Sequence, residues 1–181
     1  MQIQTQRLLL REFVEDDWQA VLAYQADPLY LRYYAWDVRT EQDARQFVRM
    51  FIGWQEELPR TRVQLAICLP GSGELIGNCG IRKPRPNANQ AELGYELAPW
   101  HWGRGYATEA ARAMLAFAFS FPDIHRVTAS CLAENRASVR VLEKLGFKVE
   151  ALQPEREYFK QRSWEVLLFS LENPQAGVPN T

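Results

Sequence analysis

A helical stripe of small side chains, preceded by two closely spaced glycines, most restricts how this chain can fold. Apolar residues recur at the helical period along the stripe, at Ala107, Ala110, Ala111, Met114, Leu115 and Ala118. Because most of these side chains are alanines, the helix can lie close against a sheet. Gly103 and Gly105 come directly before the helix. The sequence therefore predicts a strand, a tight glycine loop and a helix packed on a sheet.

Strand patterns precede this helix. Three runs rich in apolar residues, 63–69, 75–82 and 91–97, are separated by segments of Pro, Gly, Ser and Asn. Such segments favour turns, so the three runs are expected to form an antiparallel meander. A further strand is expected within residues 6–13, at the start of the chain.

Helices are expected between the first strand and the meander. Acidic residues at 15–17 suit the first turn of a helix that runs toward Pro28. Thr40 and Asp43 have the spacing of a variant capping box, which predicts a helix with an apolar face. That face consists of Ala44, Phe47, Val48 and Phe51.

The last third of the sequence continues with strand and helix signals. A strand is expected over 126–132, and Asn135 is expected to cap a helix that ends at Gly146 in a Schellman motif, with Leu142 contacting Phe147. Strands over 148–152 and 164–171 would complete one domain over residues 1–172. Residues 173–181 have the composition of a frayed tail.

Size and charge limit the function. A chain of 181 residues suits a single domain, and a net charge of −1 provides no global attraction for nucleic acid or an anionic membrane. The sequence lacks a leader pattern and a long apolar run, so a cytoplasmic protein is expected. Cys68, Cys79 and Cys131 are far apart in sequence, and we expect small buried side chains, with no disulfide and no metal site.

The glycine loop has the character of an anion site. Backbone at Gly103 and Gly105 can approach a phosphate closely, and the first turn of the following helix presents N–H groups and the positive end of its dipole. Arg104 adds charge at the rim. The dinucleotide fingerprint does not fit, because Thr108 replaces its third glycine, and the Walker pattern lacks its lysine. The loop is therefore interpreted as a pyrophosphate site of another kind.

Residues 102–107, Trp-Gly-Arg-Gly-Tyr-Ala, resemble the coenzyme A loop of the GNAT superfamily of N-acetyltransferases. Trp102 departs from the Gln or Arg usual in that loop, and this departure resembles the branch of ribosomal-protein-alanine N-terminal acetyltransferases. The resemblance extends over most of the chain. It includes Thr5-x-Arg7-Leu8, Ile76-Gly77 and the segment from Asn135 to Phe147.

The resemblance implies an α/β (α+β) fold with a mixed, mostly antiparallel sheet of about seven strands and about four flanking helices. It also implies that a bulge near Leu97 and Ala98 splays the fourth strand from the fifth, which opens a slot for acetyl-coenzyme A. The cofactor-binding residues expected from it are Leu97, Ala98, Trp102, Gly103, Arg104, Gly105, Tyr106, Ala107, Asn135 and Ser138.

Asn135 and Ser138 have two interpretations. Asn at the N-cap and Ser at N3 are ordinary at a helix start. In the resembling branch the equivalent Asn contacts coenzyme A and the equivalent Ser lies near its sulfur, so Ser138 could protonate the departing thiolate. The superfamily's usual Tyr for that role is not evident from the sequence, which leaves the general acid open.

Amide formation also needs the thioester carbonyl polarised and the amine deprotonated. A backbone N–H near Leu97 is expected to polarise the carbonyl. Glu92 and Glu96, on one strand face, and Glu165 are candidate bases, with Glu96 nearest the slot. They could equally be paired or solvent-facing carboxylates, and a dedicated base could be absent.

Aromatic residues concentrate in the segment after the first helix. Tyr33, Tyr34 and Trp36, together with Tyr30, are expected to form a wall of the acceptor pocket, or alternatively to attach helices to the sheet. His101 and His125 are expected to be surface residues or residues behind the site.

The expected function is transfer of acetyl from acetyl-coenzyme A to a primary amine, first of all the α-amino group of a protein N-terminus. A small metabolite or antibiotic amine, a non-catalytic acyl-coenzyme A sensor and an interaction module that uses the aromatic patch remain alternatives. A monomer or homodimer is expected, with no nucleic-acid or membrane partner.

Overall fold

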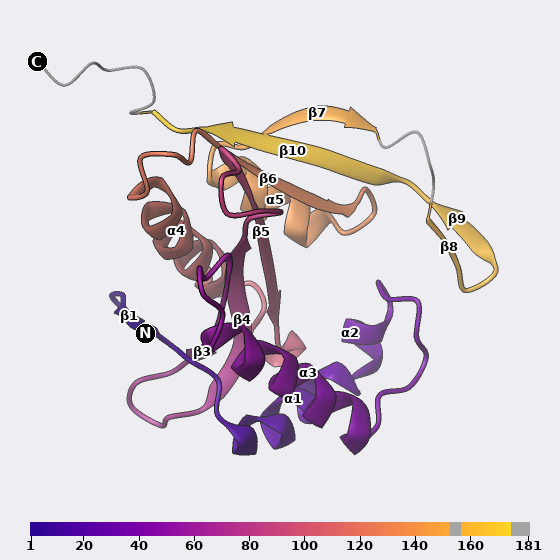
Figure 1. Ribbon diagram of the computed structural model, residues 1–181. Coiled ribbons are helices and arrows are strands. Elements are labelled where there is room, and N and C mark those ends of the chain that lie inside the picture. The colour runs from indigo at the N-terminus through magenta and orange to yellow at the C-terminus, as the bar shows by residue number, and fades with distance from the viewer. Residues whose placement is uncertain (153–156, 175–181) are drawn as a thin grey trace, which may run out of the picture.

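The chain is described from a computed structural model, in which residues 1–152 and 157–174 are described. Its main feature is an eight-stranded sheet in the order β1-β2-β3-β4-β5-β6-β10-β7, beside a two-stranded hairpin of β8 and β9. The β5–β6 pair is parallel and the other pairs are antiparallel. The predicted mixed, mostly antiparallel sheet is confirmed (Figure 1).

The N-terminal strand is shorter than predicted. β1 (Gln2–Gln4) and β2 (Leu9–Arg11) form a small hairpin, and a turn closed by the Thr5 N–H on the Leu8 carbonyl, at 2.9 Å, separates them. This turn explains why residues 6–13 do not form one strand. A short 3-10 helix, Glu15–Asp17, then leads into α1 (Trp18–Gln25).

Two more helices follow on the same side of the sheet. They are α2 (Pro28–Leu31) and α3 (Glu41–Gln55). The predicted capping box at the start of α3 is confirmed, since Thr40 Oγ1 accepts from the Asp43 N–H at 3.2 Å and Asp43 Oδ2 accepts from the Thr40 N–H at 2.8 Å. The start of α3 is thus fixed by local hydrogen bonds.

The predicted meander is confirmed. β3 (Arg62–Cys68), β4 (Leu75–Arg82) and β5 (Gln90–Leu97) pair antiparallel in chain order. β6 (Arg126–Leu132) joins β5 only at its start, where residues 90–92 face residues 126–128. Beyond Glu92 the two strands part, and β6 instead pairs along its length with β10 (Val166–Glu172). This parting is the predicted splay.

A bulge near Leu97 and Ala98 does not cause the splay. The pairing of β5 with β4 keeps its register as far as Gly77 opposite Leu97, and the Ala98 N–H continues it by donating to the Ile76 carbonyl at 2.8 Å. The expectation of a bulge is therefore wrong for the described strand. The gap opens because β6 follows β10 away from β5.

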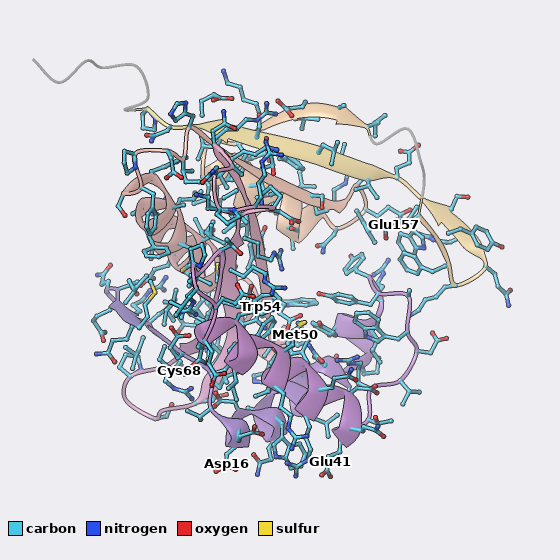
Figure 2. The ribbon with its side chains drawn as sticks, viewed as in Figure 1. Asp16, Glu41, Met50, Trp54, Cys68 and Glu157 are labelled. Carbon is cyan, nitrogen blue, oxygen red and sulfur yellow. The ribbon has the colours of Figure 1, made fainter. Side chains whose placement is uncertain are left out.

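Helices cover both faces of the sheet. Helices α1 to α3 lie against one face, and α4 (Tyr106–Phe119) and α5 (Arg136–Lys144) lie against the other (Figure 1). The predicted stripe of α4 is confirmed over five of its six positions, which are fully buried: Ala110, Ala111, Met114, Leu115 and Ala118. Trp54 of α3 and Cys68 of β3, labelled in Figure 2, belong to the separate core beneath α1 to α3.

The helix after β6 ends as the sequence predicts. The Phe147 N–H donates to the Leu142 carbonyl at 3.1 Å and the Gly146 N–H to the Glu143 carbonyl at 3.0 Å, while Gly146 has a φ of 90°. These are the hydrogen bonds of a Schellman motif. β7 (Lys148–Leu152) follows and pairs with β10.

The hairpin of β8 (Glu157–Phe159) and β9 (Arg162–Trp164) was not predicted from the sequence. Its turn residues Lys160 and Gln161 both have a positive φ, a conformation that the sequence signals assign to Gly or Asn. The strand predicted over 164–171 is correspondingly shifted: Trp164 is the last residue of β9, and β10 starts at Val166.

Asn173 is part of the folded domain. It is buried, its N–H donates to the His125 carbonyl at 2.7 Å, and its side-chain amide donates to the Ile124 carbonyl at 3.0 Å. The predicted tail thus begins after this residue at the earliest, and most of it, residues 175–181, lies outside the described residues.

Three properties of the described chain bear on its chemistry. Cys68, Cys79 and Cys131 are free thiols. Among residues 1–152 and 157–174, acidic, His and Cys side chains form no cluster that could hold a metal ion. The helices of this part of the chain are too short or too polar to cross a membrane.

Gly77 allows β4 to approach the part of β5 that forms the site. A Cβ built on Gly77 would lie 2.2 Å from the Glu96 carbonyl oxygen and 2.9 Å from the Leu97 Cα. We predict that Gly77→Ala lowers the free energy of unfolding by about 1–3 kcal/mol, as overpacking of a core does. Urea denaturation measures this change. Gly53→Ala, in open space on α3, should instead add about 0.5–1 kcal/mol, and equal effects of the two substitutions would contradict the packing argument.

Candidate active site

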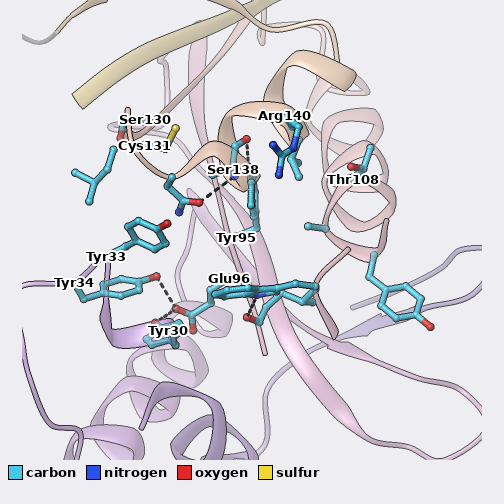
Figure 3. A pocket seen from close by; sticks show the side chains of 18 of the residues that line it. Tyr30, Tyr33, Tyr34, Tyr95, Glu96, Thr108, Ser130, Cys131, Ser138 and Arg140 are labelled. Carbon is cyan, nitrogen blue, oxygen red and sulfur yellow. Dashed lines mark hydrogen bonds between the residues drawn. The ribbon is translucent and has the colours of Figure 1, made fainter. Parts of the chain in front are cut away.

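A cavity of about 600 Å³ lies between the diverging strands β5 and β6 (Figure 3). Most of its lining comes from α2 and the segment after it, the end of β5, the glycine loop with the first turn of α4, β6, and α5 with its N-cap, and Glu157 and Val166 add to it from β8 and β10. The volume is in the range of small-molecule binding sites. The parting of the strands therefore gives the protein one large site within the sheet.

The glycine loop forms one end of the cavity. Gly103 and Gly105 have φ values of 76° and 81°, and Gly105 is the N-cap of α4. Tyr106, Ala107 and Thr108, in the first turn of α4, line the cavity with the two glycines. A first helical turn carries N–H groups without helical acceptors, so this end of the cavity suits an anion.

The N-terminal segment holds this loop in place. Glu109 of α4 accepts hydrogen bonds from Thr5 Oγ1 at 2.7 Å and from the Arg7 N–H at 2.8 Å, and the Arg7 guanidinium pairs with it at 2.7 Å. Arg7 also donates to the Arg104 carbonyl at 3.0 Å and lies over the Tyr106 ring. Burial alone would raise the pKa of Glu109, but the hydrogen bonds from Thr5 and Arg7 lower it below its ordinary value of 4.5.

Two residues expected to contact the cofactor, Ala98 and Arg104, are outside the lining of the cavity. Ala98 is fully buried and does not line the cavity, because its backbone extends the β4–β5 pairing. The Arg104 side chain is exposed and likewise outside the lining. Arg140 and Lys144 of α5, which sequence reasoning missed, supply cationic side chains to the cavity instead. Their spacing of four residues, following Asn135, was the available signal.

Trp102 secures the end of β5. Its indole Nε1 donates to the Leu97 carbonyl at 2.8 Å, so this aromatic residue satisfies a strand carbonyl that β6 has left unpaired. The Ala98 N–H points to β4. Because successive N–H groups point to opposite edges of a strand, the Leu97 N–H points away from β4 and toward the cavity. Leu97 and Trp102 thus both line the cavity, as expected from the sequence.

Asn135 and Ser138 lie together at the start of α5. Asn135 Oδ1 accepts from the Ser138 N–H at 3.2 Å, which is the helix-capping bond, and both residues line the cavity. The Ser138 hydroxyl lies 2.9 Å from the Tyr95 hydroxyl, which also donates to the Ser138 carbonyl at 3.2 Å. Burial raises the pKa of Tyr95, so its hydroxyl carries its proton at neutral pH.

Tyr95 was missed because it alternates with Leu93 and Leu97 on β5 and has the pattern of a core residue. Cys131 of β6 also lines the cavity, which corrects the expectation that every cysteine is a buried core residue. Burial raises the pKa of the Cys131 thiol, and a hydrogen bond from Ser138 partly opposes this. Ser138 is thus close to two protonated side chains.

Glu96 is surrounded by hydrogen-bond donors from α1, α2, β4 and the segment after α2. Its Oε1 accepts from Tyr24 at 2.7 Å, Gln25 at 3.0 Å and Asn78 at 2.6 Å, and its Oε2 accepts from Tyr30 and, at 3.4 Å, from Tyr34. Figure 3 shows Tyr30 and Tyr34 pointing at the carboxylate. These donors occupy the acceptor sites of the carboxylate. The hydrogen bond from Tyr34 is the longest of them, so it is the one that another donor can most easily replace.

The tyrosines around Glu96 remain phenols. Burial, followed by the negative charge of Glu96, raises the pKa of Tyr24, Tyr30 and Tyr34. Sequence reasoning missed the donors Tyr24, Gln25 and Asn78. Asn78 had a signal, because it is a polar residue within an otherwise apolar strand; Gln25, at the end of a short helix, had none.

Aromatic rings form the wall opposite α5. Tyr34 stacks between Tyr30, at 4.4 Å, and Trp36, at 4.8 Å, and the Arg39 guanidinium covers Trp36. Arg39 also donates to Gln25 Oε1 at 3.0 Å, so the wall is connected to the Glu96 cluster. The three residues expected in an acceptor pocket, Tyr33, Tyr34 and Trp36, all line the cavity.

The remaining candidates lie outside this arrangement or differ from expectation. Among the described residues that line the large cavity, neither Glu92 nor Glu165 occurs; both are exposed, and Glu92 lies 3.7 Å from Arg82. His101, expected at the surface or behind the site, is buried and lines the cavity, with its Nε2 2.9 Å from Glu74 Oε1. His125 is exposed.

Comparisons with known proteins agree with this geometry. Residues 7–148 match the family model described as "Acetyltransferase (GNAT) domain". The chain is 37% identical over 150 residues to the uncharacterized N-acetyltransferase YnaD of Bacillus subtilis, which covers 83% of this chain and 84% of that protein.

Solved structures share the fold. A putative ribosomal-protein-serine acetyltransferase from Vibrio cholerae has a TM-score of 0.78 at 26% identity, over 95% of this chain and 97% of that chain. The RimL ribosomal alpha-N-protein acetyltransferase in complex with coenzyme A has a TM-score of 0.82 at 20% identity, over 95% and 98%. The likeness to the second structure is one of fold.

The Glu109 contacts lead to a prediction about pH. Because its folded pKa is lowered, their stabilising contribution is present above the ordinary value of 4.5 and is lost as pH falls through the lower folded pKa. Glu109→Gln should therefore unfold at a lower temperature than the wild type at pH 7, and the difference should shrink below pH 4.5. Thermal unfolding at pH 7, 5 and 3.5 measures it. A difference that stays constant with pH would contradict a charge-based role.

Proposed function

The chain belongs to the GNAT acetyltransferase family and uses acetyl-coenzyme A as its co-substrate, and from this premise we propose that it acetylates the N-terminal α-amino group of a protein. One observation carries the proposal. A single cavity joins an anion-binding helix N-terminus to an aromatic wall and a carboxylate, with the Leu97 N–H and Ser138 between them. These are the parts that acyl transfer to an amine requires.

The residues present fit acetyl-coenzyme A. The first turn of α4 with Gly103 and Gly105 would hold the pyrophosphate, and Arg140 and Lys144 would add positive charge beside it. The pantetheine arm would follow the gap between β5 and β6, past Leu97 and Asn135. Coenzyme A supplies the activated acetyl thioester. The protein supplies its position.

The amine attacks the thioester carbonyl carbon, the C–S bond breaks, and the thiolate takes up a proton. The Leu97 N–H, directed at the cavity, would stabilise the developing oxyanion. Ser138 would donate the proton to the thiolate, Tyr95, hydrogen-bonded to it at 2.9 Å, would replace that proton, and Tyr95 would regain its own proton from solvent. Tyr95 thus supplies the phenol that the sequence did not reveal.

Glu96 would act on the acceptor amine. Its other donors, Tyr24, Gln25, Tyr30 and Asn78, are buried, whereas Tyr34 is half-buried in the wall of the cavity and is bonded to it at 3.4 Å. An incoming amine, or a water between amine and carboxylate, can exchange for Tyr34 at this position. Glu96 would then receive the amine proton while Tyr24, Gln25 and Asn78 hold the carboxylate in place.

A protein N-terminus is the acceptor we favour. The similar Vibrio cholerae structure is described as a putative ribosomal-protein-serine acetyltransferase, and the aromatic wall is partly exposed at Trp36, where a peptide could continue outward. A small amine is the alternative acceptor, and the assay below separates the two. The reaction is proposed to take place in the cytoplasm, where acetyl-coenzyme A is available.

The first test combines binding with turnover. Acetyl-coenzyme A at about 100 times its dissociation constant should stabilise the wild type by roughly 2.7 kcal/mol in thermal unfolding. Gly105→Trp, which fills the loop, should abolish this stabilisation. Gly73→Trp is the matched control, because Gly73 has a similar positive φ of 72° in a turn outside the cavity, and this variant should still be stabilised.

Release of free thiol across a panel of peptides and small amines then identifies the acceptor. Faster release with peptides that carry a free α-amino group, and not with their blocked forms or with polyamines, is expected. A preference for small amines would replace the proposed acceptor, and an absence of both stabilisation and thiol release would contradict the enzyme.

Glu96 and Glu92 provide a second test. Glu96→Gln should lower kcat by about 10²–10⁴-fold, the range of general base catalysis, with acetyl-coenzyme A stabilisation retained. Glu92→Gln, on the same strand but exposed, should leave kcat within about twofold of the wild type. Full activity of Glu96→Gln would show that the base lies elsewhere.

A further inference from the structure

The β8–β9 hairpin reaches across to the segment that follows α2. Figure 1 shows it extending from the β10 side of the molecule toward α2, and Figure 2 labels Glu157 at its start, where it lines the cavity. The hairpin and the aromatic wall therefore lie on two sides of one opening.

The tip of the hairpin has an unusual backbone. Lys160 and Gln161 have φ values of 51° and 59°, which are left-handed conformations in residues other than glycine. Such conformations cost energy for residues with a Cβ and persist where surrounding contacts require them. Glycine at either position would adopt this backbone conformation at a lower energetic cost.

The side chain of Lys160 reaches from this turn to the segment after α2. Its Nζ donates to the Leu31 carbonyl at 2.7 Å and lies 3.3 Å from Asp37 Oδ1. Leu31 is the last residue of α2, and residues 32–37 form turns and bends. A single ammonium group thus connects both ends of the segment that carries Tyr33, Tyr34 and Trp36.

Aromatic packing supports the same arrangement. Trp164 of β9 stacks on Phe159 of β8 at 4.9 Å and meets the edge of the Tyr33 ring at 6.4 Å. These rings form a small separate apolar cluster with Leu132 and Val166. The cluster attaches the hairpin near Tyr33, while Lys160 fixes the rest of the segment as far as Asp37.

The geometry points to Lys160 as a positioning residue for the amine acceptor: by holding Leu31 and Asp37 together, it fixes the aromatic wall and the hydroxyl of Tyr34 relative to Glu96. This inference rests on the proposed function only in assigning that wall to the acceptor. Lys160 itself is outside the lining of the cavity, and it acts through Tyr33, Tyr34 and Trp36.

The hairpin turn supplies a matched pair of variants. Lys160→Gly removes the ammonium but relieves the positive φ, so it should fold at least as well as the wild type. Gln161→Gly relieves the neighbouring positive φ and keeps the ammonium. Any loss seen only in Lys160→Gly therefore comes from the missing contact and not from the turn.

Amide hydrogen exchange tests the contact without an acceptor. In the peptide covering residues 30–38, exchange should be several-fold faster in Lys160→Gly than in Gln161→Gly, with unchanged exchange in the first turn of α4. Equal exchange in the two variants would overturn the inference. Lys160→Met, which keeps the wild-type turn, should behave as Lys160→Gly does.

Steady-state kinetics tests its consequence. With the acceptor found in the thiol-release assay, Lys160→Gly should raise the acceptor KM by roughly tenfold, the effect of losing one charged hydrogen bond, and leave the KM for acetyl-coenzyme A unchanged. Gln161→Gly should match the wild type in both. An unchanged acceptor KM beside faster exchange would overturn the positioning role. A wild type that acetylates no amine would instead refute the proposed function, and the exchange result would still decide whether Lys160 holds the segment.

Discussion

The parting of β5 from β6 after Glu92 determines the rest of the site. A strand edge inside a protein carries N–H and C=O groups that need partners. At the end of β5 the Trp102 indole satisfies the Leu97 carbonyl, while the Leu97 N–H is directed at the cavity. The backbone group proposed to stabilise the oxyanion is therefore a consequence of the sheet's own geometry. It needs no bulge, because β6 leaves β5 by following β10.

The same gap brings a carboxylate close to a hydrophobic core. Glu96 lies on β5 beneath α1 and α2, and burying it requires several hydrogen bonds. Those bonds come from Tyr24 and Gln25 of α1, Asn78 of β4 and Tyr30 of α2. The need to satisfy one charge thus ties the helices to the sheet at the place where the acceptor is proposed to bind. Tyr30 and Tyr34 thus belong to the aromatic wall and also donate hydrogen bonds to Glu96.

The sequence was most informative where local rules decide the structure. The stripe of α4, the capping box at Thr40 and the Schellman motif at Gly146 follow from spacing and side-chain type, and each was predicted. The β8–β9 hairpin was missed because Lys160 and Gln161 adopt a turn that their side chains do not favour. Tyr95 and Asn78 act through neighbours distant in sequence, and a single sequence does not show such contacts.

The two halves of the cavity are held by different kinds of structure. The half proposed to bind acetyl-coenzyme A lies on α4 and α5, and Thr5 and Arg7 fix its loop through Glu109. The half proposed to bind the acceptor lies on turns after α2, held by side-chain contacts from Arg39 and Lys160. Because sites on helices are more rigid than sites on loops, substitutions in residues 32–37 can alter the acceptor wall without moving the coenzyme A loop.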